Sequence, residues 1–354
     1  MASPRAGSAV DPGLAFGLMW MGFVAYLGVV AAAPSLGERL IWGAIVVLLA
    51  AFAVAPVLLS HDVYSYVDYA RLGVRHGLDP YVHPPQAAAA DPAFAKVTWT
   101  ESTSAYGPLF TLLTYPLAWL PVAAAVTLLK AVAALSVLTT AALASRIAAW
   151  RGVEPLRTAA FVALNPLVLV HVVGGAHNDG LTMLLAMLAV AAILAARELS
   201  GGAALAAAVA TKLSAAFLAP FALLACLPSA RRLLGGFLAT ALALAIAAHL
   251  AFGWDWLSGF GLAGENQSRT SHMSIPITAA RLTGLDPDLV RLVAAVLFGA
   301  TVAYLLAWTY RGGDWIRAAA WTALALLLAT SWLLPWYLIW ALPLAAISRD
   351  RPLQ

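Results

Sequence analysis

Two polar, aromatic-rich stretches interrupt an otherwise apolar chain, and they contain the residue types that could do chemistry. The first covers residues 60–108 and opens with His61 and Asp62, and the second covers residues 253–291. Together they hold 15 of the 36 Asp, Glu, Lys and Arg residues. A carboxylate in low-dielectric surroundings binds its proton more tightly, so Asp62 at the end of an apolar span could act as a general base. The alternative is an ordinary aspartate that caps the following helix.

A second polar cluster lies in a very short segment between two apolar runs. It contains His177, Asn178 and Asp179. Asp179 could simply cap the next helix, but the free N–H groups of a helix start also favour an anion such as a phosphate. Lys212 stands in a third apolar segment, where a lysine predicts function unless it snorkels to an interface. Lys130, deep in a long apolar span, is expected to pair with a carboxylate that the sequence does not identify.

The second stretch offers groups that suit a phosphorylated sugar. Arg269 and His272 stand close to Asn266 and Gln267. Arginine binds phosphate through two parallel hydrogen bonds, and amides suit sugar hydroxyls, so the arginine and histidine are candidate phosphate ligands and the amides candidate acceptor ligands. A solvated loop without a ligand would have the same composition.

The elements that position these residues are predicted to be membrane helices. The chain is 63% hydrophobic and 10% charged, whereas soluble proteins have about 25% charged residues. Apolar runs long enough to cross a bilayer recur, and a lipid environment requires helices there. The sequence therefore predicts an all-α, polytopic transmembrane bundle of about nine to eleven membrane helices. The candidate spans are 13–33, 40–59, 122–149, 158–173, 180–196, 233–252, 289–309, 316–333 and 335–347.

Three segments leave alternatives open. Residues 202–228 form either one span with Lys212 buried at its middle or a hairpin with Lys212 at its tip. Residues 109–120 could be a half-buried helix, because two prolines interrupt them. Residues 1–12 are predicted to be a disordered tail, and 13–33 to be a retained helix rather than a cleaved signal peptide.

The distribution of arginines predicts the orientation in the membrane. If residues 60–108 lie outside, nearly every short loop on the inner side contains arginine, as the positive-inside rule requires. This orientation requires the hairpin at 202–228 and brings all the polar clusters to the extracytoplasmic face. The reverse orientation would expose most of these arginines outside. Trp254, Trp256, Trp332, Trp336 and Trp340 are expected mainly at the membrane interface, with one or two free to stack on a sugar.

The first stretch is predicted to contain an amphipathic helix on the membrane surface. Tyr66, Tyr69 and Gly73 recur at helical spacing over residues 63–74, and Asp68 is expected on the solvated face. No second soluble domain follows, so residues 1–354 are treated as one domain with extracytoplasmic loops at 60–108 and 253–288.

Several function classes lack their motifs in this sequence. It contains no P-loop, no dinucleotide-binding glycine pattern, no cysteine spacing for a metal and no Gly-x-Ser-x-Gly turn. Because the acidic residues are scattered, we predict no metal site, and we predict no cofactor. Dependence on a divalent ion stays open. No nucleic-acid partner is expected.

Six short segments follow one another in a distinctive order. They are His61-Asp62-Val63-Tyr64-Ser65-Tyr66, Gly77-Leu78-Asp79-Pro80-Tyr81, Ser104-Ala105-Tyr106-Gly107-Pro108-Leu109, Asn165-Pro166-Leu167, Gly175-Ala176-His177-Asn178-Asp179-Gly180 and Ala210-Thr211-Lys212. This order resembles the GT-C superfamily of membrane glycosyltransferases. Within it, the chain is most similar to actinobacterial polyprenol-phosphate-mannose-dependent α-1,6-mannosyltransferases that build lipomannan.

The resemblance implies a fold, a reaction and roles for residues. It implies large outer loops with surface helices, a polyprenyl-phosphate-linked sugar donor, a glycan or glycolipid acceptor and transfer with inversion at the outer face of the bacterial plasma membrane. Asp62 matches the position of the base. Lys212 and Arg269, with His272, are the implied phosphate ligands, and His61, Tyr64, Tyr106, His177, Asn178 and Asp179 are the implied surroundings of the donor.

The chain is short for this family, so the sugar is not settled by the resemblance. Mannose is expected, with arabinose or glucose as alternatives. Two other functions compete with the enzyme: a flippase for lipid-linked sugars, which would need a polar path between the leaflets, and a scaffold that keeps the fold without the chemistry.

Overall fold

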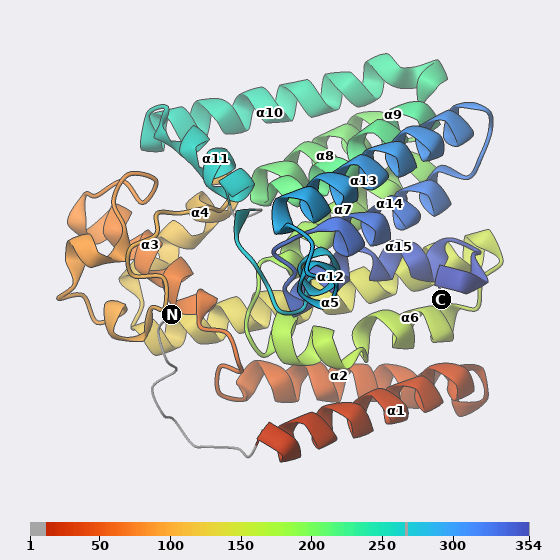
Figure 1. Ribbon diagram of the computed structural model, residues 1–354, viewed down its shortest axis with the longest axis horizontal. Helices are drawn as coiled ribbons and strands as arrows, with labels where there is room; N and C mark the ends of the chain where they lie inside the picture. The colour runs from red at the N-terminus through yellow and green to blue at the C-terminus, as the bar shows by residue number, and fades with distance from the viewer. Residues whose placement is uncertain (1–11, 266–267, 354) are drawn as a thin grey trace.

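The structure is a computed structural model that describes residues 12–265 and 268–353, and within them it contains helices and loops but no strand (Figure 1). The predicted disordered tail lies outside the described residues except for Pro12, where the first helix begins. The α-helices are α1 (Pro12–Leu36), α2 (Glu38–Val54), α3 (Asp62–His76), α4 (Pro108–Thr114), α5 (Val122–Arg151), α6 (Pro155–Ala163), α7 (Asp179–Leu194), α8 (Glu198–Thr211), α9 (Ala219–Ala225), α10 (Ala230–Phe252), α11 (Ser258–Glu265), α12 (Ile275–Thr283), α13 (Pro287–Tyr310), α14 (Trp315–Ala329) and α15 (Leu342–Ile347).

Four helical segments are long and apolar enough to cross a membrane, which confirms an all-α polytopic protein. They are Gly17–Leu36, Val122–Arg151, Leu227–Phe252 and Pro287–Tyr310. The apolar window of α13 is only 6% buried, whereas that of α5 is 44% buried. Apolar surface exposed on this scale fits lipid rather than water. Further apolar helices are shorter, from 10 to 17 residues, so the predicted total of nine to eleven membrane helices stays a prediction.

Helix α5 is the central helix of the bundle. It packs against α2, α6, α7 and α15, and most of its buried positions are alanine or other small residues. Alanine has the best helix propensity, and small side chains let neighbouring helices approach closely in a membrane. The helix ends at Gly152, which adopts φ 71°, a left-handed conformation that suits glycine at a C-terminal cap.

Residues 202–228 form a hairpin with Lys212 at its turn. Helix α8 ends at Thr211, Lys212 is extended (φ −157°), and the chain returns through the 3-10 turn Leu213–Leu218 and α9. At the other end, Ser229 Oγ lies 2.9 Å from Glu198 Oε1, so the chain leaves where it entered. With 14 residues, α8 is about 21 Å long, which is less than the ~30 Å of a hydrocarbon core.

Several predicted spans are interrupted where proline removes a backbone donor. Helix α2 stops at Val54, two residues before Pro56. The span 158–173 is broken near Pro166 into α6 and the π-helical turn Val168–Val173. The span 335–347 begins with the 3-10 turn Pro335–Trp340 before α15. Residues 109–120 form α4 and a 3-10 turn, Tyr115–Trp119, as the prolines suggested.

Helix α3 is buried rather than lying on a surface, so that part of the prediction was wrong. Its residues from Val63 to Leu72 are buried except Tyr64, and it packs against α4, α5 and the turn after α4. Asp68, expected on a solvated face, is only 1% exposed. Burial first, and the nearby Asp91 second, raise the pKa of Asp68 to about 7. The segment from Asp79 to Gly107 packs against α3, and its Asp91 pairs with Arg71. Protein therefore covers the face of α3 that the amphipathic pattern predicted to be solvated.

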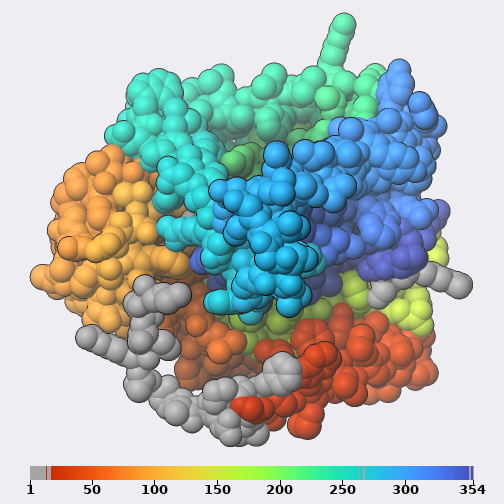
Figure 2. Space-filling model, viewed as in Figure 1, coloured from red at the N-terminus to blue at the C-terminus, as the bar shows by residue number. Residues whose placement is uncertain are grey.

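The two polar stretches meet at one end of the bundle (Figures 1 and 2). Ser258 Oγ donates to the main-chain oxygen of Tyr81 at 3.2 Å, and Trp256 packs beside the buried Tyr81 and Phe252. In Figure 2 the first stretch, in orange, and the second, in cyan, are adjacent at the surface. The predicted convergence of polar residues therefore occurs at this end.

Candidate functional site

Two strained loops place the first residues of the site beside each other. The N–H of Leu58 donates to the main-chain oxygen of Gly174 at 3.2 Å. Each loop contains a left-handed residue that is not glycine, Leu59 at φ 59° and Ala176 at φ 55°. Such conformations are costly and persist only where the surroundings enforce them. Asp62 follows the first loop, and His177 lies in the second.

The Asp62 carboxylate lies at the N-terminus of α3 and has one strong hydrogen-bond donor. Trp99 Nε1 donates to Asp62 Oδ1 at 3.0 Å, and the Asp62 side chain is 16% exposed. Burial raises the pKa of Asp62, and the Trp99 hydrogen bond and the nearby Lys212 charge lower it without cancelling that effect. The group is therefore a stronger base than an exposed aspartate, and it still lines an open cavity.

His177 faces the same carboxylate as a neutral ring. Its Nδ1 is 3.7 Å from Asp62 Oδ2, and its ring stacks on Trp336 with centroids 3.7 Å apart. Burial, followed by the Lys212 charge, holds the pKa of His177 well below 6.5. The contact with Asp62 is therefore between a neutral imidazole and a carboxylate. Within the described residues its Nε2 has no hydrogen-bond partner.

Lys212 is fixed by a buried carboxylate from the start of α7. Its Nζ lies 2.7 and 2.8 Å from the two oxygens of Asp179, which is fully buried. Trp340 Nε1 also donates to Asp179 Oδ1 at 2.7 Å. The ammonium group lies 5.0 Å from the ring centre of Tyr337, close enough for a cation–π contact. Asp179 thus orients Lys212 at the hairpin turn, in addition to starting a helix.

Arg269 supplies a cation that no carboxylate neutralises among the described residues. Its guanidinium lies 5.2 Å from the ring centre of Trp99 and 5.9 Å from that of Trp332. The two rings hold the side chain while leaving its donors available to a ligand. Trp99 therefore contacts both charged groups, since its N–H meets Asp62 and its ring meets Arg269.

These side chains surround one cavity of about 360 Å³. Asp62, Tyr106, His177, Lys212 and Arg269 all line it. Eight further lining residues are aromatic and come mainly from α3 and from the segment after α14: Tyr66, Tyr69, Trp99, Phe260, Trp332, Trp336, Tyr337 and Trp340. A base, two cations and aromatic walls in one pocket can bind a sugar phosphate and remove a proton from a hydroxyl group.

A close backbone contact fixes the edge of this cavity. Gly107 N–H donates to the main-chain oxygen of Thr211 at 3.2 Å. A Cβ atom on Gly107 would lie 2.1 Å from the main-chain oxygen of Ala210, far inside van der Waals contact. Glycine is therefore required where the chain after Tyr106 crosses the end of α8, directly before Lys212.

Five predicted site residues do not line this cavity, and one of them is Asp179, which is buried as the ion-pair partner of Lys212. His61 is exposed and packs its ring against Tyr64 at 5.7 Å, and Tyr64 lines a separate groove. His272 is exposed, with Nδ1 3.1 Å from an Arg281 nitrogen. Asn178 is buried behind the cavity, and its amide has no partner among the described residues. The predicted acceptor ligands Asn266 and Gln267 lie outside the described residues.

The aromatic walls are the part of the site that sequence reasoning missed. Trp99 was not singled out, and Trp332, Trp336 and Trp340 were assigned mainly to the membrane interface, yet all four line the cavity. The signal available was the run Trp332-Leu333-Leu334-Pro335-Trp336-Tyr337, because a proline among aromatic residues marks a break where side chains can turn toward a site. Trp254, by contrast, is 66% exposed, as an interface residue would be.

Within residues 12–265 and 268–353, no group of three or more His, Cys, Asp or Glu side chains is arranged to hold a metal ion. The question of metal dependence therefore belongs to experiment.

Comparison with known proteins identifies the family. A family model described as alpha-(1->6)-mannopyranosyltransferase, N-terminal domain, matches residues 5–228. The chain is 31% identical to the alpha-(1->6)-mannopyranosyltransferase A of Mycobacterium tuberculosis over 82% of this chain and 61% of that protein. It is 30% identical to the alpha-(1->6)-mannopyranosyltransferase A of Corynebacterium glutamicum over 46% of this chain and 34% of that protein.

The chain thus spans about three fifths of the length of the first of these relatives and less of the second. The region that matches the family model contains Asp62, Trp99, His177, Asp179 and Lys212, whereas Arg269 lies beyond that region. These findings confirm the resemblance that the motif order suggested, and the chain belongs to the alpha-(1->6)-mannopyranosyltransferase family.

Proposed function

We propose that this protein transfers mannose from a polyprenyl-phosphate-linked donor to a hydroxyl group of a glycan or glycolipid acceptor, with inversion at the anomeric carbon. Two of its relatives are named alpha-(1->6)-mannopyranosyltransferases. The observation that supports the chemistry is that the Asp62 carboxylate and the Arg269 cation, which has no carboxylate partner in the part of the chain that the structure describes, line one cavity and both contact Trp99.

In this proposal Asp62 is the general base. An acceptor hydroxyl oxygen attacks the anomeric carbon, its proton passes to an Asp62 carboxylate oxygen, and the bond between that carbon and the phosphate oxygen breaks. The polyprenyl phosphate leaves with both electrons of the broken bond. Burial of Asp62 supports this role, because a carboxyl group with a raised pKa accepts a proton more readily.

Arg269 is proposed to bind the leaving phosphate, with Lys212 assisting. Fixed cations directed at the oxygens where negative charge develops stabilise a transition state. Arg269 has no competing carboxylate among the described residues, while both oxygens of Asp179 already contact Lys212. Arg269 therefore has the greater capacity to neutralise a new anion, and Lys212 provides a fixed donor in the same cavity.

The cavity volume is consistent with a sugar and not with the whole donor lipid. About 360 Å³ is at the lower end of the roughly 300–1,000 Å³ of typical ligand pockets. The sugar ring would pack against the tryptophans and tyrosines, while the polyprenyl chain would lie outside the cavity among exposed apolar helices. In this arrangement the sugar reacts inside the polar cavity, while the polyprenyl chain lies on the apolar surface outside it.

We place the site on the extracytoplasmic side of the bacterial plasma membrane. The inferred inner loops hold Arg146, Arg151, Arg157, Arg231 and Arg232, and short loops rich in arginine stay inside. The hairpin at residues 202–228 supports this orientation, because it places Lys212 on the same side as Asp62.

A transfer assay tests the proposal with the purified full chain in detergent. Synthetic polyprenyl phosphates carrying β-mannose, β-glucose or β-arabinose are each incubated with an α-mannoside acceptor, with and without EDTA. We expect an α-linked mannose product by NMR, little product from the other sugars and no loss with EDTA. A β-linked product would contradict inversion, and loss with EDTA would contradict metal independence.

The same assay separates the enzyme from a flippase. Detergent removes the two leaflets, so a flippase would make no glycosidic product under these conditions. If no sugar is transferred, movement of a fluorescent polyprenyl-phosphate-mannose across proteoliposomes becomes the decisive measurement, and such movement would replace the proposed function.

A further inference from the structure

A second hollow lies on the opposite face of α3 from the cavity. It is a groove of about 830 Å³ between the end of α2, α3 and the first turns of α5. Tyr64, Arg71 and Arg75 line the groove, whereas Asp62, Tyr66 and Tyr69 line the cavity. Because an α-helix turns about 100° per residue, these two sets point in opposite directions. One helix therefore separates the two hollows.

The groove is positively charged. Four basic side chains line it, and no Asp or Glu is among its lining residues. Within residues 12–265 and 268–353, Arg71 is the one of the four with a carboxylate partner, Asp91 at 2.7 Å. Arg75 donates to the main-chain oxygen of Ala118 at 2.7 Å, and Lys96 lies over the ring of Tyr64 at 5.2 Å. The other lining cation is Lys130. Neither it, Arg75 nor Lys96 has a carboxylate within ion-pair distance among the described residues.

Lys130 is the most unusual of these cations. It is 2% exposed, and its ammonium group donates to the main-chain oxygens of Ala55 and Pro56, the latter at 3.1 Å. The sequence predicted a carboxylate partner, but the structure provides carbonyl groups from the break after α2. These orient the ammonium group without neutralising it. A buried charge without a counter-ion is costly, and an anion in the groove would supply one.

The surroundings of the groove are apolar and exposed. Val54 is 80% exposed and Trp119 is 68% exposed, and both line it. They lie next to the ends of apolar helices, where the headgroups and hydrocarbon chains of a bilayer meet. Cations at the head of a groove and exposed apolar walls along it suit an anionic amphiphile.

We propose that this groove binds an anionic glycerophospholipid, with its phosphate near Arg75, Lys96 and Lys130 and its acyl chains along α2 and α5. The lipid is a structural ligand and does not react. The inference does not depend on the transfer reaction, because the groove and the cavity are lined by different faces of α3.

Native mass spectrometry of the delipidated full chain in detergent tests the proposal. The probes are phosphatidylglycerol and phosphatidylcholine of identical acyl chains. We expect preferential binding of phosphatidylglycerol, weakened about fivefold by Arg75→Gln and again by Lys96→Gln, since each basic residue near an anionic lipid contributes comparably. Both side chains are exposed, so neither variant should disturb folding. Arg157→Gln, an exposed arginine outside the groove, is the matched control and should bind as the parent does.

Several outcomes would overturn the proposal. Equal binding of the two lipids, or equal losses in Arg75→Gln and Arg157→Gln, would mean nonspecific attraction. Displacement of phosphatidylglycerol by millimolar inorganic phosphate would mean a simple anion site. Displacement by stoichiometric polyprenyl phosphate, abolished in Lys96→Gln, would assign the groove to the isoprenoid carrier instead.

Discussion

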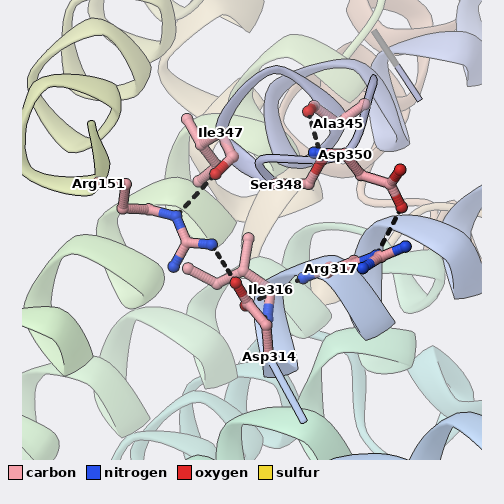
Figure 3. Close-up of polar contacts among 8 residues, drawn as sticks. All are labelled: Arg151, Asp314, Ile316, Arg317, Ala345, Ile347, Ser348 and Asp350. Carbon is pink, nitrogen blue, oxygen red and sulfur yellow. Dashed lines mark hydrogen bonds and ion pairs between the residues drawn. The ribbon is translucent and has the colours of Figure 1, made fainter. Parts of the chain in front are cut away.

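The protein places an aspartate, a basic residue and a tryptophan together at each of two ends of the bundle, with different surroundings. At the cavity, fully buried Asp179 contacts Lys212 at 2.7 Å and Trp340 Nε1 at 2.7 Å. At the other end of α14, buried Asp350 contacts Arg317 at 2.6 Å and Trp321 Nε1 at 2.7 Å. Each is an aspartate held by one cation and one indole. Figure 3 shows the Arg317–Asp350 pair of the second group, next to the contacts of Arg151 with Asp314 and with the main-chain oxygen of Ile347.

The difference lies in what surrounds each group. Around Asp350, the cations Arg151 and Arg317 both have carboxylate partners and the helix ends of α5, α14 and α15 are tied together (Figure 3). Around Asp179, the cation Arg269 packs on the rings of Trp99 and Trp332 and has no carboxylate partner among the described residues, and the carboxylate Asp62 accepts from the Trp99 indole. Paired charges hold helices in place, whereas charges left without an opposite partner beside a cavity are available to a ligand.

The largest predicted effect comes from removing the charge of each buried aspartate in turn and comparing the two single variants. Asp179→Asn removes the counter-ion of Lys212, which is 19% exposed, and should lower the free energy of unfolding by about 3–5 kcal/mol and abolish most transfer. Asp350→Asn should cost less stability, because Arg317 is 45% exposed and can turn to water, and should leave transfer per folded molecule unchanged. Thermal unfolding measures the stability of the two variants, and the transfer assay measures their activity per folded molecule. Equal losses of transfer in the two variants would remove the distinction between the two ends.

The second-largest predicted effect comes from replacing Arg269, the cation without a carboxylate partner among the described residues. Arg269→Gln should lower the transfer rate by about 100-fold, the usual effect of deleting one stabilising donor, with little change in thermal stability. Arg281→Gln, an exposed arginine of the same stretch, should change neither. Kinetics at saturating donor are the measurement, and parent-like rates in Arg269→Gln would assign the phosphate to Lys212 alone.

The third effect tests the backbone contact that fixes the cavity edge. Gly107→Ala places a Cβ atom 2.1 Å from the main-chain oxygen of Ala210 and should lower the free energy of unfolding by about 1–3 kcal/mol. Gly43→Ala, in α2 with nothing within 4 Å of the added atom, should be neutral or slightly stabilising. The melting temperatures of the two variants are the measurement. An unchanged melting temperature in Gly107→Ala would mean that α4 and α8 can move apart to accept the added atom.

The smallest effect is a shift in pH dependence. Asp62 must be ionised to act as a base, so activity should fall as the pH drops through its raised pKa. Trp99→Phe removes a donor that stabilises the carboxylate, so the pKa of Asp62 should rise further. The acidic limb of the pH–activity profile should then move about one pH unit higher. Trp254→Phe, at an exposed position, should leave the limb in place. A limb that moves lower in Trp99→Phe would contradict Asp62 as the titrating group.

The sequence could predict the membrane fold and the central residues of the site because composition and motif order encode them. Apolar runs identified α1, α5, α10 and α13, and the arginine distribution required the hairpin turn at Lys212. Asp62, Tyr106, His177, Lys212 and Arg269 do line one cavity. His177 was tied to Asp62 only by the meeting of two loops, a contact between positions over 100 residues apart.

The remainder could not be predicted, because burial on both faces of a helix depends on what covers it. Asp68 belongs to an amphipathic pattern, which predicts one wet face, yet the segment from Asp79 to Gly107 buries it. Trp336 and Trp340 are of a residue type that is typical of the membrane interface, and the chain break at Pro335 directs their side chains into the cavity. Tyr64 and Tyr66 are two residues apart, and the helix sends them to different hollows.

The central claim is that the Asp62 carboxylate is the catalytic base, and one comparison of variants tests it most directly. Single-turnover transfer of mannose is measured for the parent, Asp62→Asn and Asp68→Asn, with donor binding measured in parallel. We predict that Asp62→Asn binds donor normally and transfers 100- to 10,000-fold more slowly, in the range of a lost general base, while Asp68→Asn transfers as the parent does. Transfer by Asp62→Asn at the parent rate would contradict the account.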